Sequence, residues 1–529
     1  MCSITPTEGR AAARVLIVGA GPTGLMLALC LKQYGIDFDI VDAKAGPSID
    51  SKALAINPMS QMQCSLFFGD SLLGKKSVQV NNLNINWKNS TRINRIDLSR
   101  LKSPFTTMLV QTQFATENEL LAHAQEREIH VQWNTRVHDI EQTIQHVLVT
   151  TQPASGSSSS KYYDYVIGCD GKRSVVRTAM GATMEQKSYE MFLALADYQL
   201  NTELDEQSAH YIIFEETFFV LVPLGNKKWR IVVKHNGIPD KRNGIELIEG
   251  PVKKYLGDTL LTGEPFWFSQ APLYVSYAEK LSSDRLFIAG DAAHLFSPIG
   301  GTGMNSGFLD ALNLGWKLAY KILGYSKENV LTNSYNEERL PAIKENAAAT
   351  DRLTQLISRI ATSDKDIAMF LPTMKNRLLM RSVLPSNVAG TVLNYESSSV
   401  IVNTENKDLV LADNKLAEMA SVYAQYNRNQ APLIKLFFFL DSKTNETEKI
   451  LALPRKQGLQ PIVVTAHSTG EDILYKSKNH LCIPEKEWNA FTSQYSLVAV
   501  RPDGVVACRS QIADYNTMIS QSFNYLNAA

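Results

Sequence analysis

Three glycines near the N-terminus have the spacing of a loop that holds phosphate groups. They form Gly19-x-Gly21-x-x-Gly24, directly after an apolar run, residues 15–18, that is typical of a buried parallel strand. In such a loop the first glycine permits a tight turn, the second lets the backbone approach a pyrophosphate, and the third allows close packing of helix on strand. The helix expected over residues 25–34 would offer its free N–H groups to the phosphates. The segment therefore predicts a dinucleotide site.

An acidic residue lies where a dinucleotide site needs one. Asp42 follows the second expected strand, residues 38–41, where a carboxylate accepts hydrogen bonds from ribose hydroxyls. A glycine-rich turn without a ligand is the alternative, but the order of strand, glycines, helix and acidic residue favours a nucleotide. The pattern alone does not distinguish NAD from FAD. The residues it assigns to the cofactor are Gly19, Ala20, Gly21, Pro22, Thr23, Gly24 and Asp42.

Two further motifs place an aspartate beside a glycine after an apolar strand. One is Cys169-Asp170-Gly171-x-x-Ser174-x-x-Arg177, and the other is Gly290-Asp291-Ala292-Ala293-His294, followed by a glycine-rich loop over residues 298–305. In this order, and together with the N-terminal glycines, the motifs resemble those of the para-hydroxybenzoate-hydroxylase-like family of flavin aromatic hydroxylases. Three motifs in the family's order are far more specific than any one of them.

The resemblance implies FAD as the cofactor and transfer of oxygen as the reaction. In the family, NADPH or NADH reduces FAD, O2 adds to give a C4a-hydroperoxyflavin, and the distal oxygen passes to an electron-rich substrate. For this chain it implies a single-component monooxygenase that hydroxylates an aromatic, phenol-like or polyketide-like substrate. No side chain is needed as a nucleophile, so no catalytic residue is assigned. The resemblance adds these cofactor residues: Lys52, Gln113, Val137, Asp170, Gly290, Asp291, Pro298, Gly300, Gly301, Gly303, Met304 and Asn305.

Some residues of the motifs have a structural alternative or depart from the family. Asp291 could cap the following helix as well as hold the ribityl chain, and a structural role is favoured for His294. Lys52 stands where the family usually has arginine, which keeps the charge but loses the bidentate fork. Leu54 occupies the position of an aspartate that helps deprotonate the substrate in the phenol hydroxylase subgroup. We therefore expect another base, or a substrate that is not a simple phenol.

The elements around these motifs predict an α/β fold. A Rossmann-like FAD-binding domain with a mostly parallel sheet is expected over 1–180 and 270–345, and an antiparallel substrate-binding sheet over 181–270, with parts of 75–110. A capping-box pattern, Thr116 with Glu119 three positions on, predicts a helix over 116–127. The substrate sheet supplies four candidate pocket residues, for which ordinary sheet packing is the alternative: Tyr211, Phe214, Phe219 and Trp267.

The C-terminal third of the chain differs from the rest in composition and in its expected elements. Residues 346–404 predict a helical segment and a linker, and residues 405–529 a separate domain. Its segment 498–507 resembles the final hairpin of the thioredoxin-like domain found in phenol-hydroxylase-type members. The redox pair is missing, because Cys482 and Cys508 stand far apart and no C-x-x-C occurs. We expect a structural or oligomerisation module, compatible with a homodimer.

Composition excludes several other classes of protein. Lys plus Arg and Asp plus Glu both number 53, so no net charge attracts nucleic acid. The cysteines and histidines lack zinc spacing, and no metal is expected. The apolar stretch 15–31 is short for a membrane span and is broken by glycines and a proline. The first 14 residues lack the apolar core of a secretory signal, so a cytoplasmic location is expected.

Three alternative functions accompany the main prediction. A Baeyer–Villiger or antibiotic-modifying monooxygenase of the same family would differ only in substrate. A non-catalytic flavin-binding scaffold would act through the C-terminal domain. A flavin-dependent halogenase shares the fold, but the absence of a Trp-x-Trp-x-Ile-Pro segment counts against it.

Overall fold

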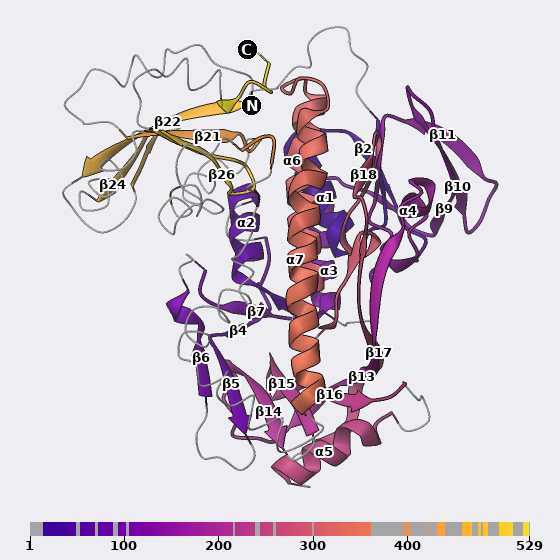
Figure 1. Cartoon of the computed structure of the whole chain (residues 1–529), viewed down its shortest axis with the longest axis vertical. Helices are drawn as coiled ribbons and strands as arrows, with labels where there is room; N and C mark the ends of the chain where they lie inside the picture. The colour runs from indigo at the N-terminus through magenta and orange to yellow at the C-terminus, as the bar shows by residue number, and fades with distance from the viewer. Residues whose placement is uncertain are drawn as a thin grey trace.

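The structure is a computed structural model of the chain, and its elements are arranged around two large sheets, with a further six-stranded sheet formed by the C-terminal strands (Figure 1). It describes residues 14–48, 53–68, 72–87, 94–101, 105–214, 217–238, 244–257, 261–298, 301–360, 395, 398–401, 419, 431–439, 458–467, 474–477, 480–484, 497–510 and 522–527.

The first large sheet has six strands and carries the N-terminal glycine motif. Its order is β18-β19-β12-β1-β2-β8, and every neighbouring pair is parallel except β18 with β19. The strands are β1 (Val15–Val18), β2 (Phe38–Val41), β8 (Val131–Gln132), β12 (Tyr165–Gly168), β18 (Ser282–Ser283) and β19 (Leu286–Ile288). All of β1 and β19 is buried, as their continuous apolar runs predict. The three motifs follow β1, β12 and β19, three adjacent strands, at one edge of the sheet.

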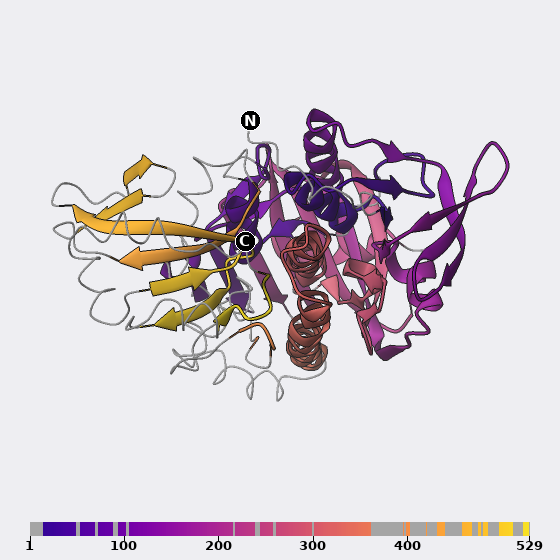
Figure 2. The same cartoon turned by 90° about the horizontal axis from the view of Figure 1, so that it is seen from above.

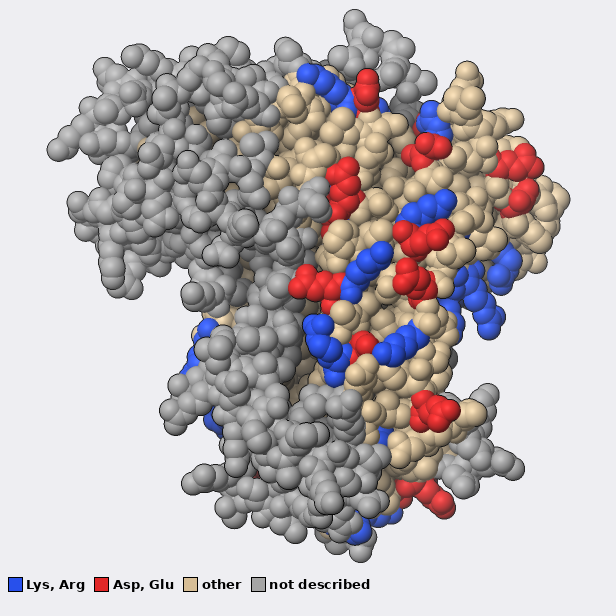
Figure 3. All heavy atoms as spheres, viewed as in Figure 1, with Lys and Arg blue, Asp and Glu red and all other residues tan. Residues whose placement is uncertain are grey.

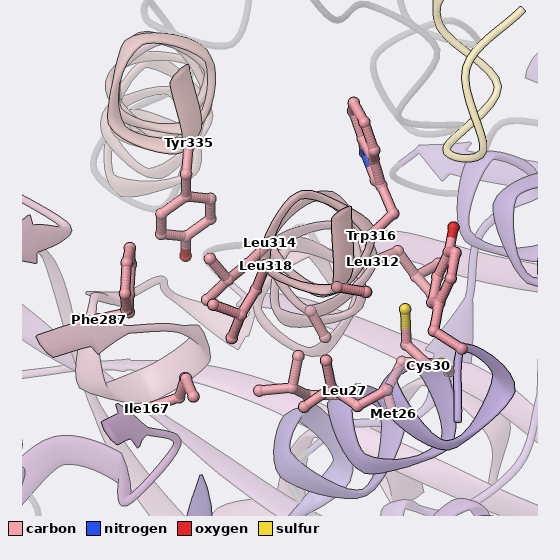
Figure 4. Close-up of a cluster of buried hydrophobic side chains, with 14 of the residues drawn as sticks. Met26, Leu27, Cys30, Ile167, Phe287, Leu312, Leu314, Trp316, Leu318 and Tyr335 are labelled. Atoms are coloured by element: carbon pink, nitrogen blue, oxygen red, sulfur yellow. The ribbon is translucent and has the colours of Figure 1, made fainter. Parts of the chain in front are cut away.

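Helices pack against this sheet, and their apolar side chains form a hydrophobic core with those of the strands. The helices concerned are α1 (Pro22–Gln33), α3 (Gln113–Glu126), α6 (Thr302–Ile322) and α7 (Val330–Ile360). Figure 4 shows Met26 and Leu27 of α1 in one buried cluster with Leu314 and Leu318 of α6, with Ile167 and Phe287 of the sheet beside them. All four helix side chains are fully buried, and each buried side chain of this size contributes about 1.5–3 kcal/mol. The α1–α6 contact therefore holds the first and third motifs together.

The second large sheet has eight strands and is mostly antiparallel, as the alternating aromatic runs predict. Its order is β20-β17-β13-β16-β15-β14-β5-β6, and only β14 with β5 is parallel. The strands are β5 (Asn82–Trp87), β6 (Asn94–Asp97), β13 (Met184–Leu200), β14 (Ser208–Phe214), β15 (Thr217–Gly225), β16 (Lys228–Asn236), β17 (Leu261–Ala278) and β20 (His294–Leu295). Helix α5 (Glu246–Leu256) packs against one face through Ile248 and Val252. Helix α7 reaches the other face with Leu353 and Ile357.

Two smaller sheets flank the first domain. One joins β3 (Ala55–Ile56) and β4 (Val78–Val80) to β7 (Met108–Val110). The other is formed by β9 (Thr135–Gln142), β10 (Val147–Pro153) and β11 (Ser159–Tyr163), whose hairpin tip contains the serine-rich segment. Figure 2 shows this hairpin at the side of the molecule opposite the C-terminal strands.

The C-terminal strands form a mixed six-stranded sheet, in the order β23-β24-β22-β21-β25-β26. They are β21 (Ile434–Phe439), β22 (Leu459–His467), β23 (Leu474–Ser477), β24 (His480–Pro484), β25 (Leu497–Val500) and β26 (Val506–Ser510). The expected turn at Asp503-Gly504 is confirmed, and Gly504 adopts a φ of 78° there. This sheet packs on helix α2 (Pro58–Phe68) through Met62 and Leu66.

One predicted helix start is wrong by one turn. Helix α3 begins at Gln113, and its cap is Thr112, whose hydroxyl accepts from Ala115 N at 3.2 Å. Thr116 lies inside the helix, where its hydroxyl donates to the Thr112 carbonyl. The expected capping-box partner, Glu119, instead accepts hydrogen bonds from Gly74 N and Lys75 N, both at 3.0 Å. Tertiary contacts therefore use a carboxylate that the local pattern assigned to the helix end.

Charged side chains of both signs are mixed on the visible surface. On the face in Figure 3, basic and acidic side chains alternate over the described part, without a patch of one sign. Within the ranges given above, no helix combines the length and apolarity needed to cross a membrane. The same ranges hold no cluster of three or more His, Cys, Asp or Glu side chains with the arrangement of a metal site.

Candidate functional site

One cavity, of about 820 Å³, runs from the glycine motif of β1 to the face of the eight-stranded sheet. Ligand cavities commonly measure about 300–1,000 Å³. Its nucleotide half is lined by polar groups at the carboxyl ends of β1, β2 and β12, and its sheet half is almost entirely apolar. Ligands of open parallel sheets bind at these strand ends. The cavity therefore joins a polar nucleotide half, here called the cradle, to an apolar sheet half, here called the pocket.

Two glycines of the first motif stand where the protein packs too closely on itself for any side chain. Gly19 has a φ of 101°, which disfavours any side chain, and an added Cβ atom would lie 2.3 Å from the Cys169 carbonyl oxygen. A Cβ atom on Gly24 would lie 1.9 Å from the Gly19 carbonyl oxygen. Both glycines thus permit close packing beneath the loop. Gly21, Pro22 and Thr23 line the cavity above it, at the start of α1.

Asp42 completes the cradle from the end of β2. Its side chain is 8% exposed and lines the cavity. One carboxylate oxygen accepts from Ala20 N and the other from Lys44 N, each at 2.8 Å. Each oxygen keeps a second lone pair for a hydroxyl donor. This arrangement suits a ribose and explains the role of Ala20, which lies outside the lining but orients Asp42.

We predict that Asp42→Asn lowers the affinity for FAD at least tenfold, equivalent to about 1.4 kcal/mol. The amide has only one acceptor oxygen, so the Ala20 or Lys44 N–H would face an NH2 group and the ribose would lose an acceptor. Fluorescence titration of the apoprotein with FAD measures the change. Asp37→Asn, at an exposed position on the same segment, is the matched control. Equal affinities of the two variants would contradict the assignment.

The second motif is fixed by its own hydrogen bonds and by the third motif. One Asp170 oxygen accepts from Val175 N at 2.7 Å, while the other is buried without a partner. Burial raises the pKa of Asp170, although hydrogen bonds from Ser174 and Val175 oppose the shift. Arg177 donates to the Ala292 carbonyl at 2.8 Å and so ties the second motif to the third. An unsatisfied carboxylate oxygen beside a cavity is what an absent ligand would leave.

The third motif and the start of α6 form the opposite wall. Asp291, Pro298, Gly301, Gly303 and Met304 all line the cavity. Thr302, also in the lining, has a buried hydroxyl oxygen without a hydrogen-bond partner. The backbone amides of this loop and the first turn of α6 are suited to stabilise negative charge on a ring system.

Two residues predicted for this wall do not line the cavity but support the residues that do. Asn305 donates to the carbonyls of Ala55 and Gly301, each at 2.8 Å, and accepts from Asn57 N at 2.9 Å. It therefore fixes the loop rather than facing the cavity. Gly290 is buried, and its N–H donates to Asp310 at 3.0 Å.

His294 is buried and lies outside the lining, as its favoured structural role predicts. Its Nε2 lies 2.6 Å from an Asp310 oxygen, and Arg339 Nε donates to the other Asp310 oxygen at 2.8 Å. Burial alone would raise the pKa of Asp310, but His294 and Arg339 hold it down at about 2. Asp310 is thus a charged anchor beneath the third motif.

A second group of buried charges joins α6 and α7 to the C-terminal hairpin. The two Glu338 oxygens accept from Arg501 at 2.7 and 2.8 Å, and one also accepts from Lys317 at 2.8 Å. Asp503 accepts from Arg501 Nε at 3.0 Å. All four side chains are at most 1% exposed. The C-terminal hairpin therefore pairs with charges in the core of the first domain.

The remaining cofactor predictions divide into three outcomes. Gln113 and Val137 line the cavity, and Gln113 is held by a 2.8 Å bond to Glu117. Gly24 supports the loop without lining it. Lys52 and Gly300 lie outside the described residues.

The four candidate substrate residues do not share one face of the sheet. Tyr211 lines the cavity, whereas Phe219 is fully buried on the opposite face, against Tyr255 of α5. The prediction for Phe219 is wrong, because successive strand residues point to opposite faces and it pairs with Ile212 rather than Tyr211. Trp267 stacks on Arg230 at 4.1 Å and does not line the cavity. The side chain of Phe214 lies outside the described residues.

The sequence reasoning missed most of the apolar lining. From the cavity face of the sheet and from α7 the missed residues include Leu193, Leu195, Ile213, Phe218, Val220, Val222, Val232, Leu353 and Ile357, and from β4 to β7 they include Val80, Leu83, Ile85, Ile96, Met108 and Val110. Strict alternation from Tyr211 would have selected Ile213, and alternation from Phe218 would have selected Val220 and Val222. The contribution of α7 has no local signal in the sequence.

This fold and cavity define a dinucleotide-binding flavoprotein whose cavity is covered by a mostly antiparallel sheet, and comparison with known proteins agrees. A model of the family described as "FAD binding domain" matches residues 12–350. Pentachlorophenol 4-monooxygenase of Sphingobium chlorophenolicum is 26% identical over 521 residues, 94% of each chain. Rifampicin monooxygenase of Rhodococcus hoagii is 30% identical over 353 residues, 66% of this chain and 72% of that protein.

Solved structures share the architecture as well. The anhydrotetracycline hydroxylase OxyS of Streptomyces rimosus superposes with a TM-score of 0.74 at 21% identity, covering 98% of this chain and all of that one. The chain belongs to the FAD binding domain family. The prediction of an FAD-dependent monooxygenase is confirmed.

Proposed function

We propose that the enzyme uses NADPH or NADH and O2 to hydroxylate an aromatic substrate, either phenol-like or polyketide-like. The observation that carries this proposal is the single cavity that joins the nucleotide cradle to an apolar pocket. The names of relatives support it, since one acts on pentachlorophenol and another on 6-methylpretetramide. When bound, FAD would supply electron transfer and oxygen activation.

In this proposal the protein binds and orients the cofactor, and it excludes water from the reaction. The cradle of Gly19, Gly21 and Asp42 would hold the pyrophosphate and a ribose, and Asp291 would hold the ribityl chain. The loop at Gly301 and Gly303 would place N–H donors at the ring, where they stabilise the reduced form. The apolar side chains of the sheet half would exclude water from the reaction.

Substrate-dependent oxidation of NADPH, followed by product analysis, tests the function. A product that gains one oxygen from isotopically labelled O2 would support it. NADPH consumption that yields only hydrogen peroxide with every phenol and polyketide offered would count against it. If FAD binds and NADPH is not oxidised at all, the non-catalytic scaffold is favoured.

The rifampicin monooxygenase relative supports a second candidate, oxygenation of an antibiotic. It would use the same cavity and differ in the product. An oxygen on a ring carbon as a new hydroxyl indicates hydroxylation, whereas an oxygen inserted next to a carbonyl indicates Baeyer–Villiger chemistry.

Asp291→Ala should lower FAD affinity at least tenfold, about 1.4 kcal/mol, because a polar contact to the ribityl chain is removed. Asp139→Ala, which removes an exposed carboxylate from β9, is the control. Unchanged binding by Asp291→Ala would mean that the third motif does not hold the cofactor.

We propose the following division of the chain: FAD binding at 1–180 and 270–345, substrate binding at 181–270 with parts of 75–110, a helical linker at 346–404, and a C-terminal domain at 405–529. The first two units correspond to the two large sheets. Helix α7 bridges them, which supports a linker that starts late in that helix.

We also propose that the C-terminal domain is thioredoxin-like and structural. Its mixed sheet has parallel β21, β22 and β24 and an antiparallel hairpin at one side, which supports this fold. Both cysteines are buried, burial raises the pKa of Cys508 to about 11, and Cys482 lies 3.0 Å from the Thr465 hydroxyl. These surroundings disfavour thiolate chemistry. A homodimer and a cytoplasmic location stay predictions.

A further inference from the structure

A buried lysine on the cavity face of the substrate sheet has no described partner. Lys234 lies in β16 and is 5% exposed, and its Nζ atom makes no hydrogen bond. An unpaired buried ammonium costs several kcal/mol, and such groups are concentrated at functional sites. Burial also lowers the pKa of Lys234.

The register of the sheet places Lys234 among residues that line the cavity. It pairs with Leu193 of β13, and the pairing of Val233 with Phe219 puts it next to Phe218 of β15. Leu193, Phe218 and Val232, two residues earlier on the same face, all line the cavity. Lys234 itself is not part of the lining, but its flexible four-carbon stem would let Nζ reach a ligand between these side chains.

No described carboxylate competes for Lys234 in the sheet half of the cavity. The acidic residues of the lining, Asp42, Glu117, Asp170 and Asp291, belong to the nucleotide half. Beside the sheet, Asp197 pairs with Arg230, and Asp351 pairs with Lys187 at 2.8 Å. The positive charge of Lys234 is therefore available to an anion from outside the chain.

Among the described residues, the sheet half of the lining also holds no carboxylate or histidine that could ionise a substrate. Leu54 lines the cavity and carries no charge. Burial raises the pKa of Tyr211, so its hydroxyl stays a donor. A substrate that arrives as an anion needs no base, and its ring is already electron-rich.

We propose that Lys234 is a specificity-determining residue that pairs with an anionic oxygen on an aromatic substrate, a phenolate or a ring carboxylate. This inference rests on the proposed function, because it assigns the apolar half of the cavity to the substrate. It narrows the substrate class to aromatic compounds that are ionised when they bind.

The test compares ligand binding by the FAD-loaded enzyme and by Lys234→Met and Lys234→Arg. Lys228→Met, at an exposed position on the same strand, is the control. Isothermal titration calorimetry without reductant compares 4-nitrophenol, ionised at the assay pH, with 4-nitroanisole, its neutral methyl ether. A second pair, benzoate and benzamide, distinguishes a carboxylate from a phenolate.

We expect the wild type and Lys228→Met to bind at least one anion tenfold or more tightly than its neutral partner. Lys234→Met should lose this preference, and Lys234→Arg should keep most of it. A preference that survives in Lys234→Met, or that is absent from the wild type, would overturn the proposal.

Thermal melting without ligand gives an independent readout. Lys234→Met should melt at a higher temperature than the wild type, because it removes an unpaired buried charge. A lower melting temperature would show that the ammonium is paired within the chain, which also overturns the proposal. If the anion preference is found but no oxygenated product forms with any substrate, the proposed function fails while the anion site stands.

Discussion

Replacing Glu338 by glutamine is expected to lower the free energy of unfolding by about 3–5 kcal/mol, the usual cost of removing one member of a buried ion pair. Arg501 and Lys317, both fully buried, would lose the carboxylate that accepts from each of them. Glutamine fills the same volume, so the loss would come from uncompensated charge rather than from a cavity. Denaturant unfolding followed by circular dichroism measures it.

Glu345→Gln, at an exposed position on the same helix, is the control and should stay within about 0.5 kcal/mol of the wild type. The joint replacement of all four charged residues, Glu338, Lys317, Arg501 and Asp503, by apolar residues should recover much of the loss, because the desolvation cost disappears with the charges. Wild-type stability of Glu338→Gln would show that these groups are not paired in the folded protein.

Gly24→Ala should abolish measurable FAD binding, with a loss of at least a hundredfold, or about 2.7 kcal/mol. The added methyl group would lie 1.9 Å from the Gly19 carbonyl oxygen, so the loop and α1 must separate. The cradle would then lose its shape, and the protein would lose part of its stability. FAD content after purification and thermal melting of the apoprotein measure the two effects.

Gly21→Ala separates the two effects. A Cβ atom there meets no protein atom within 4 Å, and the φ of −72° suits alanine. The variant should fold as stably as the wild type but bind FAD weakly, because the methyl group occupies space at the cavity wall. Gly46→Ala, also in open space but outside the lining, should change neither property. Strong FAD binding by Gly24→Ala would refute the packing argument.

The parts of the fold that could be predicted from the sequence are those with a local cause. The strand at residues 15–18 and the turn at Gly19 were predictable, because apolar runs and glycine spacing reflect the backbone of the same few residues. The hairpin at Asp503-Gly504 was predictable for the same reason. The motifs at Asp170 and Asp291 were recognisable because each combines a strand end with a glycine.

The features of the fold and the site that could not be predicted depend on contacts between distant segments. Phe219 was assigned to the pocket because aromatic richness does not reveal which face a strand residue occupies, and register decides that. Glu119 looked like a helix cap, but the folded chain uses it to hold the loop at Gly74. The pairing of Glu338 with Arg501 joins residues 163 positions apart, and no pattern in either segment indicates it.

That long-range pairing has a consequence for how the protein is made. Synthesis proceeds from the N-terminus, and domains generally fold as they leave the ribosome. Glu338 and Lys317 emerge well before Arg501, so during translation this part of the core carries a carboxylate without its bidentate partner. The first domain cannot reach its final charge balance until the C-terminal hairpin docks. A chain that ends before Arg501 would therefore keep Glu338 without its bidentate partner.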